Sequence, residues 1–152
     1  MADNLTPEQR SRAMSRIRRR DTRPELLLRR ALWAAGVRGY RIDDGRLPGR
    51  PDLTWSRHRV AVFVDGAFWH GHPSAYKPGC HGDYWDQKIQ RNVERDLAAD
   101  MSLREMGWIV LRLWDFDVRR NLSDSLAKIG DALAAQGSTY ESGNSLSRSN
   151  RS

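Results

Sequence analysis

Two residues whose types suit metal and acid–base chemistry, Asp52 and His70, flank a short apolar run of the chain. Asp52 follows a proline in GRPDLTW (49–55), and His70 stands in DGAFWHGH (65–72), just after RVAVFV (59–64). A hairpin of 52–56 with 59–64 would bring the Asp52 carboxylate to the carbonyl of Val64, near His70. Oxygen ligands suit Mg²⁺ and histidine suits a general base. A turn-forming aspartate and a hydrogen-bonded structural histidine are the alternatives.

Further polar candidates lie on two predicted helices. Glu25 is the last residue of TRPE (22–25), so a capping box that reaches back to the Thr22 amide explains it as well as a function does. Lys88, Asn92 and Asp96 recur every four residues beside the apolar stripe of a long helix. Such a row either points into a cleft or forms a solvated flank.

Three aromatic residues, Phe68, Trp69 and Trp85, fall outside the periodic apolar segments. In a basic protein, such rings can stack on nucleic-acid bases or wedge between base steps. Packing within the protein is the alternative, and we expect it for one of the three.

The segments between these residues predict one mixed α/β domain over residues 1–136, with helices packed on a small sheet. A capping box at 6–9 opens a basic helix through residue 20, and a second box opens a helix that ends at Gly36. The later segments predict strands at 40–42, 52–56 and 59–64, a long helix at 83–107, a strand at 108–114 and a helix from about 123. The Ser- and Gly-rich residues 137–152 predict a disordered tail.

Composition points to a polyanionic partner. The net charge of the 152 residues is +7, and residues 1–50, with 13 basic and 6 acidic side chains, account for all of it. Such an imbalance favours nucleic acid over a merely solubilising surface. The single cysteine excludes an internal disulfide and a zinc site of three or four cysteines. Without a signal-like or membrane-spanning segment, the protein is expected in the cytoplasm.

Five blocks together resemble the very short patch repair (Vsr) mismatch endonucleases of the PD-(D/E)XK-like nuclease superfamily. They are RDTRPE, LPGRPDL, VFVDGAFWHGH, YWDQKIQRNVERD and GWIVLRLWD, in family order at near-family spacing. The resemblance implies a three-layer, restriction-endonuclease-like α/β fold with a small mixed sheet. It also implies a monomer that nicks double-stranded DNA 5′ of the mispaired thymine in a T:G mismatch, using Mg²⁺, with two ions expected. Mismatch-repair accessory proteins are possible partners.

The resemblance also assigns roles to single residues. Asp52 matches the metal-binding aspartate, with the Val64 carbonyl as a second ligand, and His70 matches the proposed general base. Glu25 and Asp96 match acids that hold metal-bound waters or orient the base. The aromatic residues that match the family's intercalating rings are Phe68, Trp69 and Trp85. For contacts with the DNA we predict Arg16, Arg19, Arg20, Arg50, Lys88 and Asn92.

The chain departs from the family at its structural zinc site. The matching positions are Ala67, His72, Ser74 and Phe116, so three of the four ligands are missing. We therefore predict no family-type zinc; a different site from His72, Cys80 and His81 would fit no known ligand spacing. Asp65 also stands where some members have a histidine near the active site.

Two other functions remain open at this point. One is a related nuclease of different specificity, either linked to a restriction system or a single-strand nickase. The other is a non-catalytic DNA-binding module, against which the intact Asp52 argues.

Overall fold

The computed structural model describes residues 22–148, with side-chain surroundings for residues 22–136. The elements are α2 (Arg23–Ala34), β1 (Arg41–Ile42), β2 (Leu53–Trp55), β3 (Val60–Asp65), α3 (Asp83–Glu105), β4 (Ile109–Trp114), α4 (Asp115–Arg120) and α5 (Leu122–Arg148). Within these residues the order follows the sequence prediction, with α4 added. The expected helix at 6–20, with Arg16, Arg19 and Arg20, lies outside the described residues. No helix of the described part is long and apolar enough to cross a membrane.

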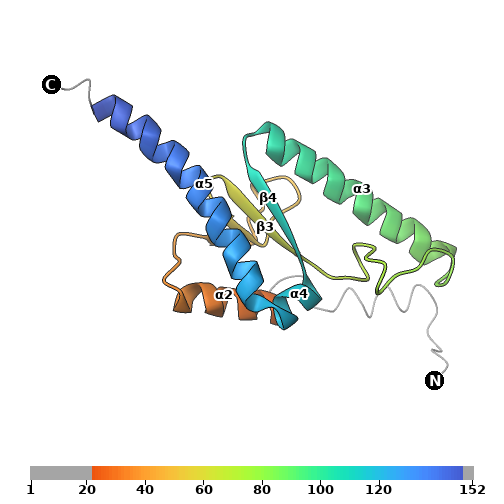
Figure 1. The fold of residues 1–152 in the computed structure, drawn as a ribbon. Coiled ribbons are helices and arrows are strands. Elements are labelled where there is room, and N and C mark those ends of the chain that lie inside the picture. Colours follow the sequence, from red (N-terminus) through yellow and green to blue (C-terminus); the bar gives the residue numbers. More distant parts are fainter. Residues whose placement is uncertain (1–21, 149–152) are drawn as a thin grey trace.

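The four strands form one mixed sheet in the order β1-β2-β3-β4. β2 and β3 are antiparallel, with Leu53 opposite Val62, so the predicted hairpin is confirmed. β3 and β4 are parallel, and α3 makes the crossover between them (Figure 1). The start of β2 therefore lies beside the end of β3, which brings Asp52 near the segment that leads to His70.

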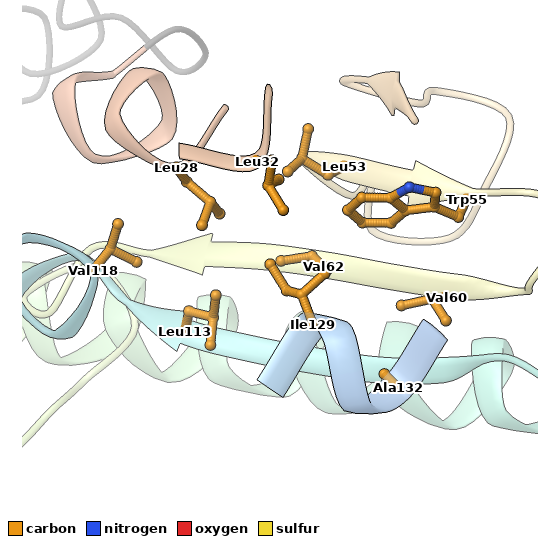
Figure 2. Close-up of a cluster of buried hydrophobic side chains, with 10 residues drawn as sticks. All are labelled: Leu28, Leu32, Leu53, Trp55, Val60, Val62, Leu113, Val118, Ile129 and Ala132. Carbon is orange, nitrogen blue, oxygen red and sulfur yellow. The ribbon is translucent and has the colours of Figure 1, made fainter. Parts of the chain in front are cut away.

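Helices cover both faces of this sheet (Figure 1). On one face, Val60 and Val62 of β3 pack against Leu28 of α2 and Ile129 of α5, within the cluster shown in Figure 2. On the other face, Ala61 and Phe63 pack against Leu103 of α3. Alternate residues of β3 thus serve two cores, as expected of a strand buried on both sides. The three-layer α/β fold implied by the resemblance is confirmed.

The structure differs from the sequence prediction in an additional short helix and in the end of the last helix. α4 has six residues, too few to show helical periodicity, and it follows β4 without a loop. α5 runs to Arg148, beyond Gly137, where a disordered tail was expected to begin. Gly and Ser in a helix interior cost up to about 1 kcal/mol each relative to Ala, so a helix anchored by Ile129 and Ala132 can continue through them.

Candidate active site

Asp52 and Glu25 meet at the end of the sheet, between α2 and the β2–β3 hairpin. The Val64 amide donates a hydrogen bond of 2.6 Å to Oδ2 of Asp52. Asp52 therefore lies beside Val64 as the hairpin predicts, although this contact uses the amide N–H. The Val64 carbonyl as a metal ligand stays a prediction. Glu25, Arg29, Asp52 and Val64 line a small hollow together with two leucines, Leu28 and Leu53.

Glu25 has a partner beyond the helix start where its sequence position places it. The Thr22 side chain makes no capping hydrogen bond, and the buried Glu25 carboxyl is hydrogen-bonded to Asp52. Burial and the charge of Glu25 raise the pKa of Asp52 to about 8. A pair of carboxyl groups that resists ionisation in this way is suited to a divalent cation, which would stabilise both charges.

His70 and Asp96 form a second pair on the α3 side of the sheet. His70 Nδ1 is hydrogen-bonded to Asp96 Oδ2, and His70 Nε2 lies 3.8 Å from Asp65 Oδ1. Burial lowers the pKa of His70, but the hydrogen bond to Asp96 and the charge of Asp65 outweigh it, so this pKa lies above its ordinary value. An imidazole held at Nδ1 by a carboxylate has a fixed orientation, as a general base requires.

Arg112 joins this pair to two more acids, and the sequence analysis did not identify it. Its guanidinium lies 3.0 Å from Asp65 Oδ1, 3.6 Å from Asp96 Oδ1 and 2.8 Å from Asp100 Oδ1. It also stacks on Phe63, with Cζ 4.0 Å from the ring centroid. A signal was present: Arg112 is the charged residue in the otherwise apolar strand WIVLRLW.

Among the described residues, one group of three acidic or histidine side chains could gather around a metal ion: Asp65, His70 and Asp96. Arg112 already supplies positive charge to both aspartates of this group. The charge balance therefore favours a hydrogen-bonded network here, and a cation at Glu25 and Asp52. His72, Cys80 and His81 do not form such a group in the described part of the chain.

The predicted aromatic residues come together where the loop between β3 and α3 (residues 66–82, the aromatic loop) meets the first turn of α3. Phe68 packs edge-on against Trp69 and Trp85, at 5.8 and 5.5 Å between ring centroids. Phe68 and Trp69 are partly exposed, whereas Trp85 is 3% exposed. In this conformation Trp85 can reach a base only after the rings packed against it, Phe68 and Trp69 among them, have moved.

The residues predicted to contact DNA have different surroundings. Lys88 lies on a groove along α3 that also holds Arg91 and Arg95, and its Nζ is 5.2 Å from the Trp69 ring centroid. Asn92 donates a 3.0 Å hydrogen bond to the Trp69 carbonyl, so it anchors the aromatic loop to α3. Arg50, in the connection between β1 and β2, is exposed and paired with Asp43 at 2.9 Å.

The four positions that match the family's zinc ligands are connected by hydrogen bonds and ring contacts. His72 donates its amide to the Ala67 carbonyl at 2.8 Å, and His72 Nδ1 lies 2.8 Å from the Ser74 hydroxyl. The His72 ring packs edge-on against Phe116, at 4.9 Å between centroids. Ala67 and Phe116 have no side-chain ligand atom, so this donor set does not fit a tetrahedral zinc site.

Comparison with known proteins agrees with this geometry. Residues 2–76 match the family model of the DNA mismatch endonuclease Vsr. A type II nicking enzyme of Neisseria meningitidis serogroup C, V.NmeDIP, is 42% identical over 86% of this chain and 90% of its own length. V.NaeI, a type II nicking enzyme of Lentzea aerocolonigenes, is 42% identical over 82% of this chain and 76% of its own. The DNA mismatch endonuclease Vsr of Escherichia coli K12 is 39% identical over 78% and 77%.

The three-layer fold, the carboxyl pair at the sheet end and these relatives define the chain as a DNA endonuclease. It belongs to the Vsr family.

Proposed function

We propose that this protein is a Mg²⁺-dependent mismatch endonuclease that nicks the DNA strand 5′ of the mispaired thymine in a T:G mismatch. The observation that carries the proposal is the hydrogen-bonded pair of Glu25 and Asp52 at the end of the sheet. The oriented His70–Asp96 pair supports it. A non-catalytic binding module has no use for a buried carboxyl pair, which opposes folding when it is ionised.

In this proposal each polar residue has a stated task. Asp52 and the Val64 carbonyl would hold Mg²⁺, and Glu25 and Asp96 would hold its waters or orient the base. Mg²⁺, when bound, supplies charge stabilisation for the phosphate oxygens, and the family resemblance favours two ions. His70 accepts a proton from the attacking water at Nε2, because Nδ1 is already bonded to Asp96. Asp96 then stabilises the imidazolium.

The aromatic loop supplies mismatch recognition in this proposal. Phe68 and Trp69 insert beside the mispair, and Trp85 supports them and reaches the DNA once they have moved. Unstacking costs a few kcal/mol per base step and least at a mispair, so insertion itself discriminates against matched duplexes. Arg50, Lys88 and the basic residues Arg16, Arg19 and Arg20 contact phosphates, while Asn92 acts through the loop that it holds.

The protein is proposed to act as a monomer on DNA in the cytoplasm. Mismatch-repair accessory proteins are proposed as its partners.

The test is a set of labelled duplexes, one matched and one for each mismatch, incubated with wild-type protein and with Asp52→Ala in Mg²⁺ or in chelator. We expect one nick, 5′ of the thymine in T:G, that requires both Mg²⁺ and Asp52. The variant should still bind the T:G duplex. Equal cleavage by Asp52→Ala, or cleavage without a divalent ion, contradicts the proposal.

A second candidate is a nickase of different, restriction-linked specificity. It is favoured by the names of two of the relatives, V.NmeDIP and V.NaeI, which are type II nicking enzymes. The same duplex set with randomised flanking bases separates the two. Cleavage of a mismatch other than T:G, or of a matched site, would support this second candidate.

A further inference from the structure

Arg112 occupies a position that neither the sequence motifs nor the proposed chemistry explains. It lies on β4 and faces α3, on the side of the sheet where Phe63 and Asp65 of β3 also point. A lone arginine on a buried strand is costly to desolvate unless its donors are used. Here they are used: Nε and Nη2 contact Asp100, and Nη1 bonds both carboxylate oxygens of Asp65 at 3.0 and 3.1 Å.

The guanidinium of Arg112 thus lies beside both acids that face the His70 ring. Asp96, on one side, accepts the bond at Nδ1 and lies 3.6 Å from Arg112 Nη1. Asp65, on the other side, lies 3.8 Å from Nε2, beyond hydrogen-bonding distance, although the same Asp65 oxygen is 3.0 Å from Arg112. The contact distances show that Asp65 is bonded to Arg112 and not to the histidine.

We propose that Arg112 is a positioning residue of the nicking reaction: it holds Asp65 back from His70 Nε2 and so keeps this nitrogen open to the attacking water. This role rests on the proposed function of His70 as general base. Phe63, under the guanidinium plane, and Asp100, at its far edge, fix the arginine in this place.

The physical argument concerns competition for one nitrogen. A buried carboxylate that loses its arginine partner is left without a hydrogen-bond donor, which is costly. The nearest histidine donor is Nε2–H of protonated His70, and a shift of about 1 Å in Asp65 would bring the two into hydrogen-bonding distance. An imidazolium bonded to Asp96 and Asp65 at its two nitrogens has no free lone pair and cannot accept a proton. Arg112 prevents this arrangement because Nη1 makes charge-assisted bonds to both oxygens of Asp65, while Nε and Nη2 hold the guanidinium on Asp100.

The test compares Arg112→Met, Asp65→Ala and the double variant on the T:G duplex in Mg²⁺. We expect Arg112→Met to lower kcat by about 10- to 100-fold, the scale of misplaced catalytic groups, with KM nearly unchanged. The double variant also removes the competing carboxylate, so its kcat should be higher than that of Arg112→Met. Where Arg112→Met lowers kcat by about 100-fold, the double variant should recover at least about 10-fold. In a His70→Ala background, Arg112→Met should cause no further loss. Arg119→Met, whose side chain is 51% exposed, is the matched control.

Two results would overturn the role of Arg112: a wild-type kcat for Arg112→Met, or no recovery in the double variant. If Arg112→Met does not fold, Arg112→Lys with and without Asp65→Ala is measured instead. A lysine keeps the charge but cannot hold Asp65 and Asp100 at once through separate nitrogens, so an undiminished kcat in that variant also overturns the proposal. Nicking by His70→Ala at the wild-type rate contradicts the proposed base itself, which is a distinguishable outcome.

Discussion

Glu25 and Asp52 share a hydrogen bond at the end of the sheet, although one stands on a helix and the other before a strand. Burial and the charge of Glu25 raise the pKa of Asp52 to about 8. The folded protein without metal thus binds a proton that the unfolded chain releases near pH 4. Without a cation, ionisation of this pair opposes folding, and a bound divalent ion would offset that cost.

Asp52→Asn should therefore abolish nicking and, without divalent ions, stabilise the fold. A carboxyl with a raised pKa favours folding less as pH rises, so wild-type stability should fall between about pH 4 and 8 and then level off. The variant should lack this decline and gain at least about 1 kcal/mol at pH 8.5, or a few degrees in Tm. Thermal unfolding across pH in chelator measures it.

The control for this experiment is Asp131→Asn, an exposed change of the same charge on α5. It should leave the pH profile unchanged. Subtracting the Asp52→Asn profile from the wild-type profile removes the contribution of the other titrating groups. If the difference in stability is then flat or rises from pH 5 to 8, Asp52 ionises normally. Adding Mg²⁺ to the wild type should reduce the decline, because the ion stabilises the charged carboxyl.

Nicking should depend on the neutral form of His70. His70→Ala should lower the rate by about 10²-fold or more, the usual contribution of a general base. Since the pKa of His70 is raised by Asp96 and Asp65, the wild-type rate at saturating Mg²⁺ should still be rising above pH 6.5. Asp96→Asn removes the largest of the raising interactions and should move this rise to lower pH. Single-turnover rates across pH measure both effects. An unshifted profile in Asp96→Asn would show that Asp96 does not raise the pKa of His70 in the nicking reaction.

The sequence predicted more of the framework than of the charge network. The hairpin that joins Asp52 to Val64 follows from two short β-prone runs, and the long helix that carries Asp96 follows from its apolar stripe. Glu25 was ambiguous because a capping box and an active-site acid place the same residue type at the same helical position. Only the tertiary packing of α2 on the hairpin shows that its partner is Asp52.

Arg112 was missed for a related reason. Its three partners come from β3 and α3, and the local sequence pattern does not show that these segments lie close to Arg112 in space. The burial of Trp85 was likewise not visible, because the loop that covers it has no periodicity. Local patterns specify elements, whereas long-range contacts decide which polar residues meet.

Recognition of the mismatch should depend on the two accessible rings of the aromatic loop. Phe68→Ala and Trp69→Ala should each weaken binding to the T:G duplex by about 1 to 3 kcal/mol, the cost of one lost stack. Binding to matched DNA should change little, because phosphate contacts dominate there. Trp33→Ala, an equally large loss from a ring that is 60% exposed on α2, is the control. Equal weakening on matched and mismatched duplexes would show that the rings have no part in discrimination.

The cluster around His72 should stabilise the loop without zinc. The purified protein should contain far less than one zinc ion per chain, and a zinc chelator should not change its Tm. His72→Ala removes the bond to Ser74 and the ring contacts with Trp114 and Phe116, so it should lower stability by about 1 to 3 kcal/mol. His72→Phe keeps the ring contacts and has no ligand atom, so its Tm should lie well above that of His72→Ala. If instead both variants lose the same stability, and the wild type releases stoichiometric zinc on unfolding, the histidine acts as a metal ligand and not as a packing residue.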